Sequence, residues 1–214
     1  MFSVLEKYDL NLNYPMQAQR SVVALGAECK GSNGMVKPSY SVAKRLHWYW
    51  QMEAGNAVLV PVTAWALVWS VGGAATAAFW VAVLACAALL VIGALYWRAV
   101  LRRIEGAAGV FEYWLPRLAA AENFMLALVS LSAIVVVLEL TLLSRGLTAA
   151  IVAAAILTAL AALEYVNYYK VQLQHFDNLA DFKRLMAGRG FRKAHMARDI
   201  AAQRSIGGKK SRVD

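Results

Sequence analysis

The sequence predicts an all-α, polytopic membrane protein whose four transmembrane helices form two hairpins with short turns, followed by an interfacial amphipathic C-terminal helix. Three observations predict this class. Hydrophobic residues make up 60% of the 214 residues, and only 16% are charged, against about 25% in soluble domains. The mean hydropathy is +0.50. The charged residues lie in blocks between long apolar stretches, as in chains that cross a membrane.

Residues 1–46 are predicted to form a cytoplasmic N-terminal arm without long regular elements. Pro15, Pro38 and the polar segment 30–34 interrupt any helical periodicity there. The length of the chain allows one membrane domain with modest extramembrane parts, and we expect that domain over residues 47–170.

The first span is expected at about residues 48–71. It opens with aromatic residues of the kind that anchor helices at a membrane interface. Pro61 falls early enough in the helix to kink it or to lie near a broken turn. The uncharged pair Gly72-Gly73 then predicts a short outer turn.

The second span is expected at about residues 74–98, with the helix continuing to Ile104 before the glycines at 106 and 109 break it. Its small residues include Ala78, Ala82 and Ala85. The third span is expected at about residues 118–143, after an interfacial aromatic segment that Pro116 should stop.

The fourth span is expected at about residues 147–170, after a second short outer turn at 144–146. Residues 147–163 carry no charge, and the stretch is long enough to cross a hydrocarbon core of about 30 Å. Small residues recur on one face at a spacing of three or four, which lets helix backbones approach closely in lipid. They are Ala150, Ala154, Thr158 and Ala161 or Ala162.

Residues 171–214 are predicted to form a basic amphipathic cytoplasmic tail. Apolar residues at three-residue spacing predict one helix over Leu173–Leu185, and a second, short helix is expected over Phe191–Arg204. The chain beyond Gly207 is expected to be disordered. The residues of the tail expected to meet lipid are Phe176, Phe182, Lys183 and Arg184.

The distribution of charge predicts the orientation of the chain. The net charge is +9, and nearly all Lys and Arg lie in the arm, the 98–117 loop and the tail. The positive-inside rule then places both termini in the cytoplasm, and we expect a bacterial inner (plasma) membrane protein. Anionic lipids at the cytoplasmic face are the expected partners of these residues, and nucleic acid is the less favoured reading because the basic tail adjoins a span.

Polar residues recur at one depth, toward the cytoplasmic ends of the spans. Ionisable groups at mid-membrane cost roughly 2.5–3.5 kcal/mol each, so they usually face partners or water. Two interpretations are open: a polar belt that lines an inward-facing cavity, or interfacial residues that lock helix packing. The structural interpretation is the favoured one. The belt consists of Glu53, Asn56, Arg98, Glu122, Asn123, Glu164 and Asn167.

Other chemistry finds little support in the sequence. His47 and His175 join the belt glutamates as possible metal ligands, but no spacing typical of a metal site occurs, so neither a metal nor a cofactor is predicted. No catalytic residue is assigned, because no nucleophile elbow or phosphate-binding loop is found. Cys29 and Cys86 form no Cys-x-x-Cys motif. Glu139 is expected to pair with Arg145 at the outer interface.

These observations favour a non-catalytic integral membrane protein, a structural or accessory subunit of a larger membrane assembly. An alternative is an oligomeric channel or transporter for a small cation or amine, which would use the polar belt. A second alternative is a membrane-embedded enzyme acting on a lipid or quinone at the cytoplasmic face. Protein partners or a homo-oligomer are expected in the first two cases.

Overall fold

The computed structural model describes residues 38–141, 147–173 and 191–210. Four of its helices are long and apolar enough to cross a membrane. The predicted class, an all-α protein with four such helices and a helix after them, is therefore confirmed. The helices are α2 (Pro38–Ser70), α3 (Ala77–Ile104), α4 (Ala108–Thr141), α5 (Ala149–Tyr169) and α7 (His195–Lys210).

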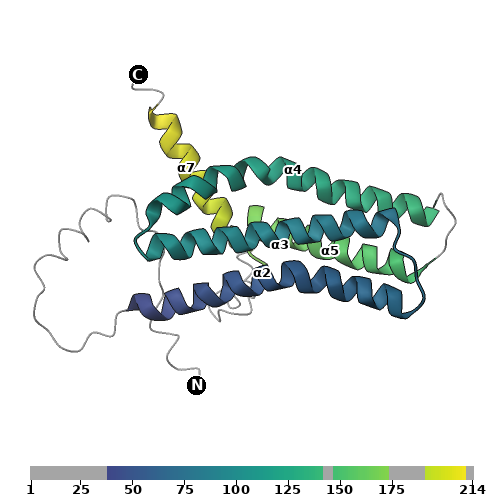
Figure 1. Cartoon of the computed structure of the whole chain (residues 1–214). Coiled ribbons are helices and arrows are strands. Elements are labelled where there is room, and N and C mark those ends of the chain that lie inside the picture. The colour runs from purple at the N-terminus through teal and green to yellow at the C-terminus, as the bar shows by residue number, and fades with distance from the viewer. Residues whose placement is uncertain (1–37, 142–146, 174–190, 211–214) are drawn as a thin grey trace, which may run out of the picture. The chain divides into compact units, whose positions relative to one another are not determined.

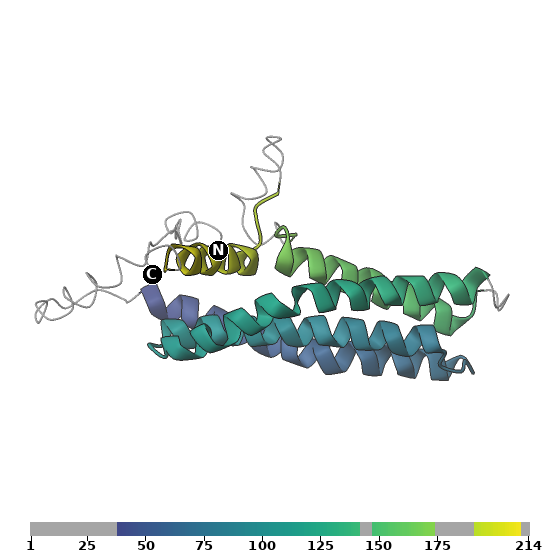
Figure 2. The ribbon, with the colours of Figure 1, turned by 90° about the horizontal axis from the view of Figure 1, so that it is seen from above.

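The four long helices run side by side, and α7 crosses them at one end (Figures 1 and 2). α3 is the central element, because it packs against both α4 and α5, which also contact each other. α7 contacts α4 and α5. α2 runs beside this unit but adds few residues to the core: among its side chains from Val42 to Ser70, only Leu46 and Val68 are buried.

Small residues form the contact faces of the central helices, as the sequence predicted. Ala78, Ala82 and Ala85 of α3 are completely buried, and Ala150, Ala154 and Ala161 of α5 are at most 1% exposed. Close backbone approach through such residues stabilises helix pairs in lipid, where no hydrophobic effect acts between helices. A hydrogen bond of 2.6 Å between the Ser132 and Thr158 hydroxyls joins α4 to α5 within this core.

Glycine ends α2 and α3 in the same way. Gly72 has φ +71° and Gly106 has φ +94°, a conformation that side chains other than glycine rarely adopt. The amide of Gly73 donates to the Val68 carbonyl, and the amide of Ala107 donates to the Arg102 carbonyl, at 2.9 and 2.8 Å. Both ends therefore have the hydrogen bonds of a Schellman motif. The first short turn is where it was predicted, and residues 144–146 lie outside the described residues.

The first turn of α3 is capped by two side chains. The Thr76 hydroxyl accepts from the amide of Phe79, and a carboxyl oxygen of Glu139 on α4 accepts from the amide of Ala78 at 2.9 Å. Glu139 is only 5% exposed. A carboxylate at a helix N-terminus satisfies a free amide and opposes the positive end of the helix dipole. Glu139 thus fastens α4 to α3; Arg145, its predicted partner, lies outside the described residues.

Two predicted helix starts were wrong. α2 begins at Pro38, inside the segment expected to be irregular, because proline is tolerated in the first turn of a helix. α4 begins at Ala108 and passes through Pro116, which was expected to stop the preceding segment. The buried side chains of Leu115 and Leu118 on either side of this proline fix the helix against its neighbours.

α2 likewise continues through Pro61 without a break. α7 extends to Lys210, although disorder was predicted from Gly207. Adding a residue to an existing helix costs much less than starting one, so a helix anchored at its N-terminal half can include glycine. The predicted helix Leu173–Leu185, with all four of its expected lipid contacts, falls outside the described residues except at Leu173.

The packing of α5 gives a prediction with a matched control. Ala154 is fully buried, whereas the next residue, Ala155, is exposed. Ala154→Leu should destabilise the folded protein by roughly 1–3 kcal/mol, because the added side chain forces α5 away from its neighbours. Ala155→Leu should change stability little. Unfolding in mixed detergent micelles measures both variants, and equal effects would contradict the packing described.

Candidate functional site

The predicted polar belt divides into separate groups in the structure. Glu53 of α2 and Glu164 of α5 come together, with Tyr168 between them. Glu122 of α4 instead joins the end of α5 and α7, and Arg98 of α3 lies over Trp50. Sequence reasoning placed the two glutamates at one depth but missed Tyr168, whose position follows only from the packing of α5 on α3.

The Tyr168 side chain can lie beside Glu53 and Glu164 because α3 has a glycine, Gly93, opposite the phenol. This side chain is 3% exposed. A methyl group at Gly93 would overlap the Tyr168 hydroxyl, so the phenol lies directly against the backbone of α3. Gly93 lies four residues after Leu89, which is fully buried, so it continues the buried face of α3. We call Glu53, Glu164, Tyr168 and Gly93 the acidic cluster.

The acidic cluster has two carboxyl groups and one phenol. Tyr168 interacts with the carboxyls of both Glu53 and Glu164, and these carboxyls also act on each other. Among the described residues, no Lys, Arg or His forms an ion pair with either glutamate. The Tyr168 hydroxyl is buried without a hydrogen bond of standard geometry to any residue of that part of the chain.

The asparagines and the arginine of the predicted belt lie in different surroundings. The Asn167 amide donates to Glu164 at 3.5 Å, and its carbonyl oxygen accepts from the amide of Leu173 at 3.0 Å. Asn167 therefore ties the acidic cluster to the chain that leaves α5. Asn56 is half-buried and Asn123 is exposed. Arg98 is exposed, and its guanidinium lies 5.6 Å from the centre of the Trp50 ring.

Glu122 forms a second, separate charged group. Its carboxyl accepts from the Lys170 ammonium at 2.8 Å and lies 3.7 Å from the Arg204 guanidinium. The hydrogen bond to Glu122 raises the pKa of Lys170. Because both cations are about half exposed or more, the ion pairs contribute little stability individually. They do fix which surfaces of α4, α5 and α7 meet.

α7 occupies the space beyond the end of α5. Met196 and Ile200 pack into the core, and the Tyr96 hydroxyl of α3 donates to Asp199 at 2.7 Å. Burial raises the pKa of Asp199, although the bond from Tyr96 and the nearby Arg103 and Arg198 act in the opposite direction.

Backbone bonds hold the segment that leads into α7. The amide of Gln172 donates to the Arg192 carbonyl at 2.8 Å, and the amide of Ala194 donates to the Lys170 carbonyl at 3.2 Å. The residues after α5 and before α7 thus pair as a short antiparallel bridge.

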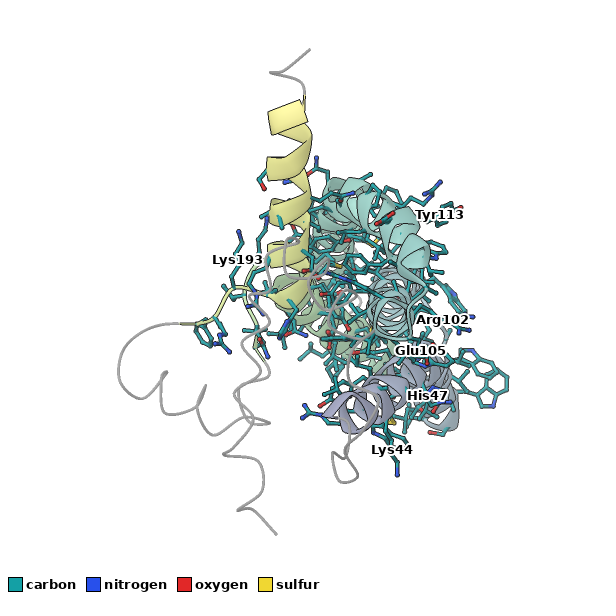
Figure 3. The ribbon with its side chains drawn as sticks, turned by 90° about the vertical axis from the view of Figure 1, so that its left-hand side faces the viewer. Lys44, His47, Arg102, Glu105, Tyr113 and Lys193 are labelled. Atoms are coloured by element: carbon teal, nitrogen blue, oxygen red, sulfur yellow. The ribbon has the colours of Figure 1, made fainter. Side chains whose placement is uncertain are left out.

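Arginine side chains at the same end of the helices lie over aromatic rings. Arg103 is 4.8 Å from the centre of the Phe111 ring, and Arg117 is 3.5 Å from that of Tyr113. Figure 3 views this end, with Lys44, Arg102, Tyr113 and Lys193 around the rim of the helices. Aromatic and basic residues side by side are typical of the boundary between lipid and water.

Comparison with known proteins adds no assignment. No protein-family model matches the chain, and the comparisons with curated proteins and with solved structures find no match. The function must therefore be argued from the residues.

The acidic cluster brings two carboxyl groups and a phenol together. Within the described ranges, no three His, Cys, Asp or Glu side chains come together as a group that could hold a metal ion. Cys86 of α3 is buried and lies close enough to Glu164 for an electrostatic interaction. The Asn167 amide beside the cluster already donates to Glu164 and accepts from the Leu173 amide.

Glycine at position 93 gives a second prediction. Gly93→Ala should push the Tyr168 ring out of its place and destabilise the protein by about 1–3 kcal/mol, because a side chain would have to share the volume of the phenol. Gly55→Ala is the matched control: it lies in α2, and its methyl group would meet no atom within 4 Å. That change should stabilise slightly through helix propensity.

Unfolding in mixed micelles measures the stability of these variants. A Gly93→Ala variant as stable as Gly55→Ala would contradict the contact between α3 and Tyr168.

Proposed function

We propose that the chain is an integral protein of the bacterial inner (plasma) membrane, with both termini in the cytoplasm. Arg98, Arg102 and Arg103 lie at the end of α3, and Lys170 follows α5. At the opposite end, residues 70–78 carry no charge. This asymmetry supports the orientation, since positive residues are retained on the cytoplasmic side during insertion.

We further propose that the protein is a non-catalytic accessory subunit that contacts another membrane protein through α2. The exposure of α2 supports this role. Only 6% of the residues in its most apolar window are buried, against 50% in α3 and 33% in α4 and in α5. One exposed face holds Val58, Val62, Trp65 and Trp69. Leu67, which is 63% exposed, lies half a turn away from Val58.

The composition of α2 explains why a partner helix would stabilise it. Helices associate in lipid through close packing, and α2 gives the core only Val68 together with partly buried residues such as Ala57 and Ala64. Its aromatic contact with the other helices lies near one end, where the Tyr49 and Trp97 rings are 5.9 Å apart. A second apolar helix from another protein would supply the packing that α2 lacks within one chain.

The alternatives have different support. A transporter or channel for a small cation or amine is supported by the acidic cluster. Within the described ranges no arrangement of residues favours a membrane enzyme acting on a lipid or quinone, so we do not propose it.

The orientation predicts the reactivity of single cysteines in a chain whose native cysteines are replaced by serine. A cysteine at Ala74 should react with a membrane-impermeant maleimide added outside intact cells. Cysteines at Gly109 and Ser205 should react only after the cells are opened, because these residues lie at the basic end. Labelling of Gly109→Cys from outside would reverse the proposed orientation.

The role of α2 predicts where the protein contacts its partner. A photo-crosslinking amino acid at Val62, which is 54% exposed, should form an adduct with another membrane protein in native membranes. The matched control is Ile134 of α4, which is 55% exposed and should show lipid contacts alone. Gel shifts and mass spectrometry identify the adducts.

Adducts at Val62 with a different protein support the accessory role. Adducts between two copies of this chain overturn that role in favour of a homo-oligomer. Equal lipid-only labelling at both positions also overturns it, because α2 would then face the bilayer.

A further inference from the structure

Two arginines of α2 and α3, at the basic end of the helices, have no acidic partner among the described residues. Arg98 is exposed, and its guanidinium lies 5.6 Å from the centre of the Trp50 ring. Arg45 is also exposed; it lies 5.7 Å from the centre of the Tyr49 ring and donates to the Tyr49 hydroxyl at 3.2 Å. Both guanidinium groups therefore have N–H groups available to an anion.

Aromatic rings join these arginines into one surface that crosses from α2 to α3. The Tyr49 ring of α2 is 5.9 Å from the ring of Trp97, which directly precedes Arg98 on α3. Trp50, the ring beside Arg98, directly follows Tyr49. We call this set the seam patch; it consists of Arg45, Tyr49, Trp50, Trp97 and Arg98.

The seam patch lies at the depth of lipid headgroups. Arg98 follows Ala77, the first residue of α3, by 21 residues, which is about 32 Å along the helix. Trp50 precedes Ser70, the last residue of α2, by 20 residues, which is about 30 Å. The hydrocarbon core of a bilayer is also about 30 Å thick. When the uncharged turn between α2 and α3 lies at one membrane surface, the seam patch therefore lies at the other.

We propose that the seam patch binds the phosphate of an anionic phospholipid. The Arg98 guanidinium presents a planar fork of N–H donors that matches two phosphate oxygens, and its contact with the Trp50 ring uses none of these donors. Trp and Tyr rings are stable at headgroup depth because one end of each ring is apolar and the other is polar. This inference does not depend on the proposed contact between α2 and a partner protein.

The charges around the patch favour a headgroup with a net negative charge over a zwitterionic one. Residues 38–52 of α2 include Lys44 and Arg45 but no Asp or Glu. These cations would repel the ammonium group of a zwitterionic headgroup. On α3 the next arginine, Arg102, is already paired with Glu105 at 3.2 Å, and Figure 3 shows both residues at this end. A lipid fits better than an acidic protein segment, because the bilayer supplies anionic headgroups at this depth.

The test uses the purified full chain in micelles of a neutral detergent, with phosphatidylglycerol as the probe. Bound lipid stabilises the folded state, so the midpoint of thermal unfolding reports binding. Phosphatidylglycerol should raise the midpoint in a saturable manner, and native mass spectrometry should detect the attached lipid. Phosphatidylcholine with the same acyl chains, and glycerol phosphate without acyl chains, should raise the midpoint less. Equal stabilisation by either of them overturns the proposal, as does no stabilisation by phosphatidylglycerol.

Two arginines one turn apart on α3 locate the site. Arg98→Gln should raise the half-saturating concentration of phosphatidylglycerol about tenfold or more, because it removes the charged donors to the phosphate. Arg98→Lys keeps the charge but loses the planar fork, so it should weaken binding by a smaller factor. The matched control is Arg102→Gln, which removes the same charge from an exposed arginine that is paired with Glu105. It should change the half-saturating concentration by no more than about twofold.

Circular dichroism verifies that each variant is folded, and Arg98→Lys keeps the proposal testable if the glutamine variant does not fold. Unchanged binding in the folded Arg98 variants overturns the assignment. Equal weakening by Arg98→Gln and Arg102→Gln also overturns it, because the lipid would then be attracted by the charged surface as a whole. Displacement of phosphatidylglycerol by soluble polyglutamate at equal charge concentration would assign the patch to an acidic protein segment instead.

Discussion

The close packing of small residues along α3 is the constraint on which the other contacts depend. In lipid, apolar helices gain nothing from water exclusion, so their association requires backbones that approach closely. The buried face of α3 provides this approach over most of its length and leaves space for Tyr168 at its only buried glycine. In chain order this face presents Ala78, Ala82, Ala85, Leu89, Gly93 and Tyr96.

The different lengths of the helices determine what lies at each end. α5 has 21 residues, about 31 Å of helix, which matches the hydrocarbon core, whereas α3 has 28 and α4 has 34. α3 and α4 therefore continue past the end of α5, and α7 packs there through Tyr96 and Asp199. The acidic cluster lies near the end of α5, between the apolar core and the ion pairs of Glu122.

Periodicity and composition were enough to predict the helices, the alanine faces and the glycine turn at 72–73. Those features depend on local spacing, which a sequence displays directly. The helix boundary predicted at Pro116 was wrong, because the buried residues beside this proline keep α4 helical. Burial cannot be read from a local sequence pattern. The glutamates could be placed at one depth but not paired, since the rotation of each helix decides that Glu53 and Glu164 meet while Glu122 turns toward Lys170.

The convergence of α2 and α5 at Tyr168 is the central claim, and cysteine cross-linking tests it most directly. In a chain whose native cysteines are replaced by serine, Glu53→Cys and Tyr168→Cys should be joined within one chain by a short bifunctional maleimide in membranes, because the native residues meet through the ends of two long side chains. Glu53→Cys paired with Glu122→Cys should not, because Glu122 belongs to a different charged group. Equal or faster cross-linking of the second pair, or none of the first, would contradict the account.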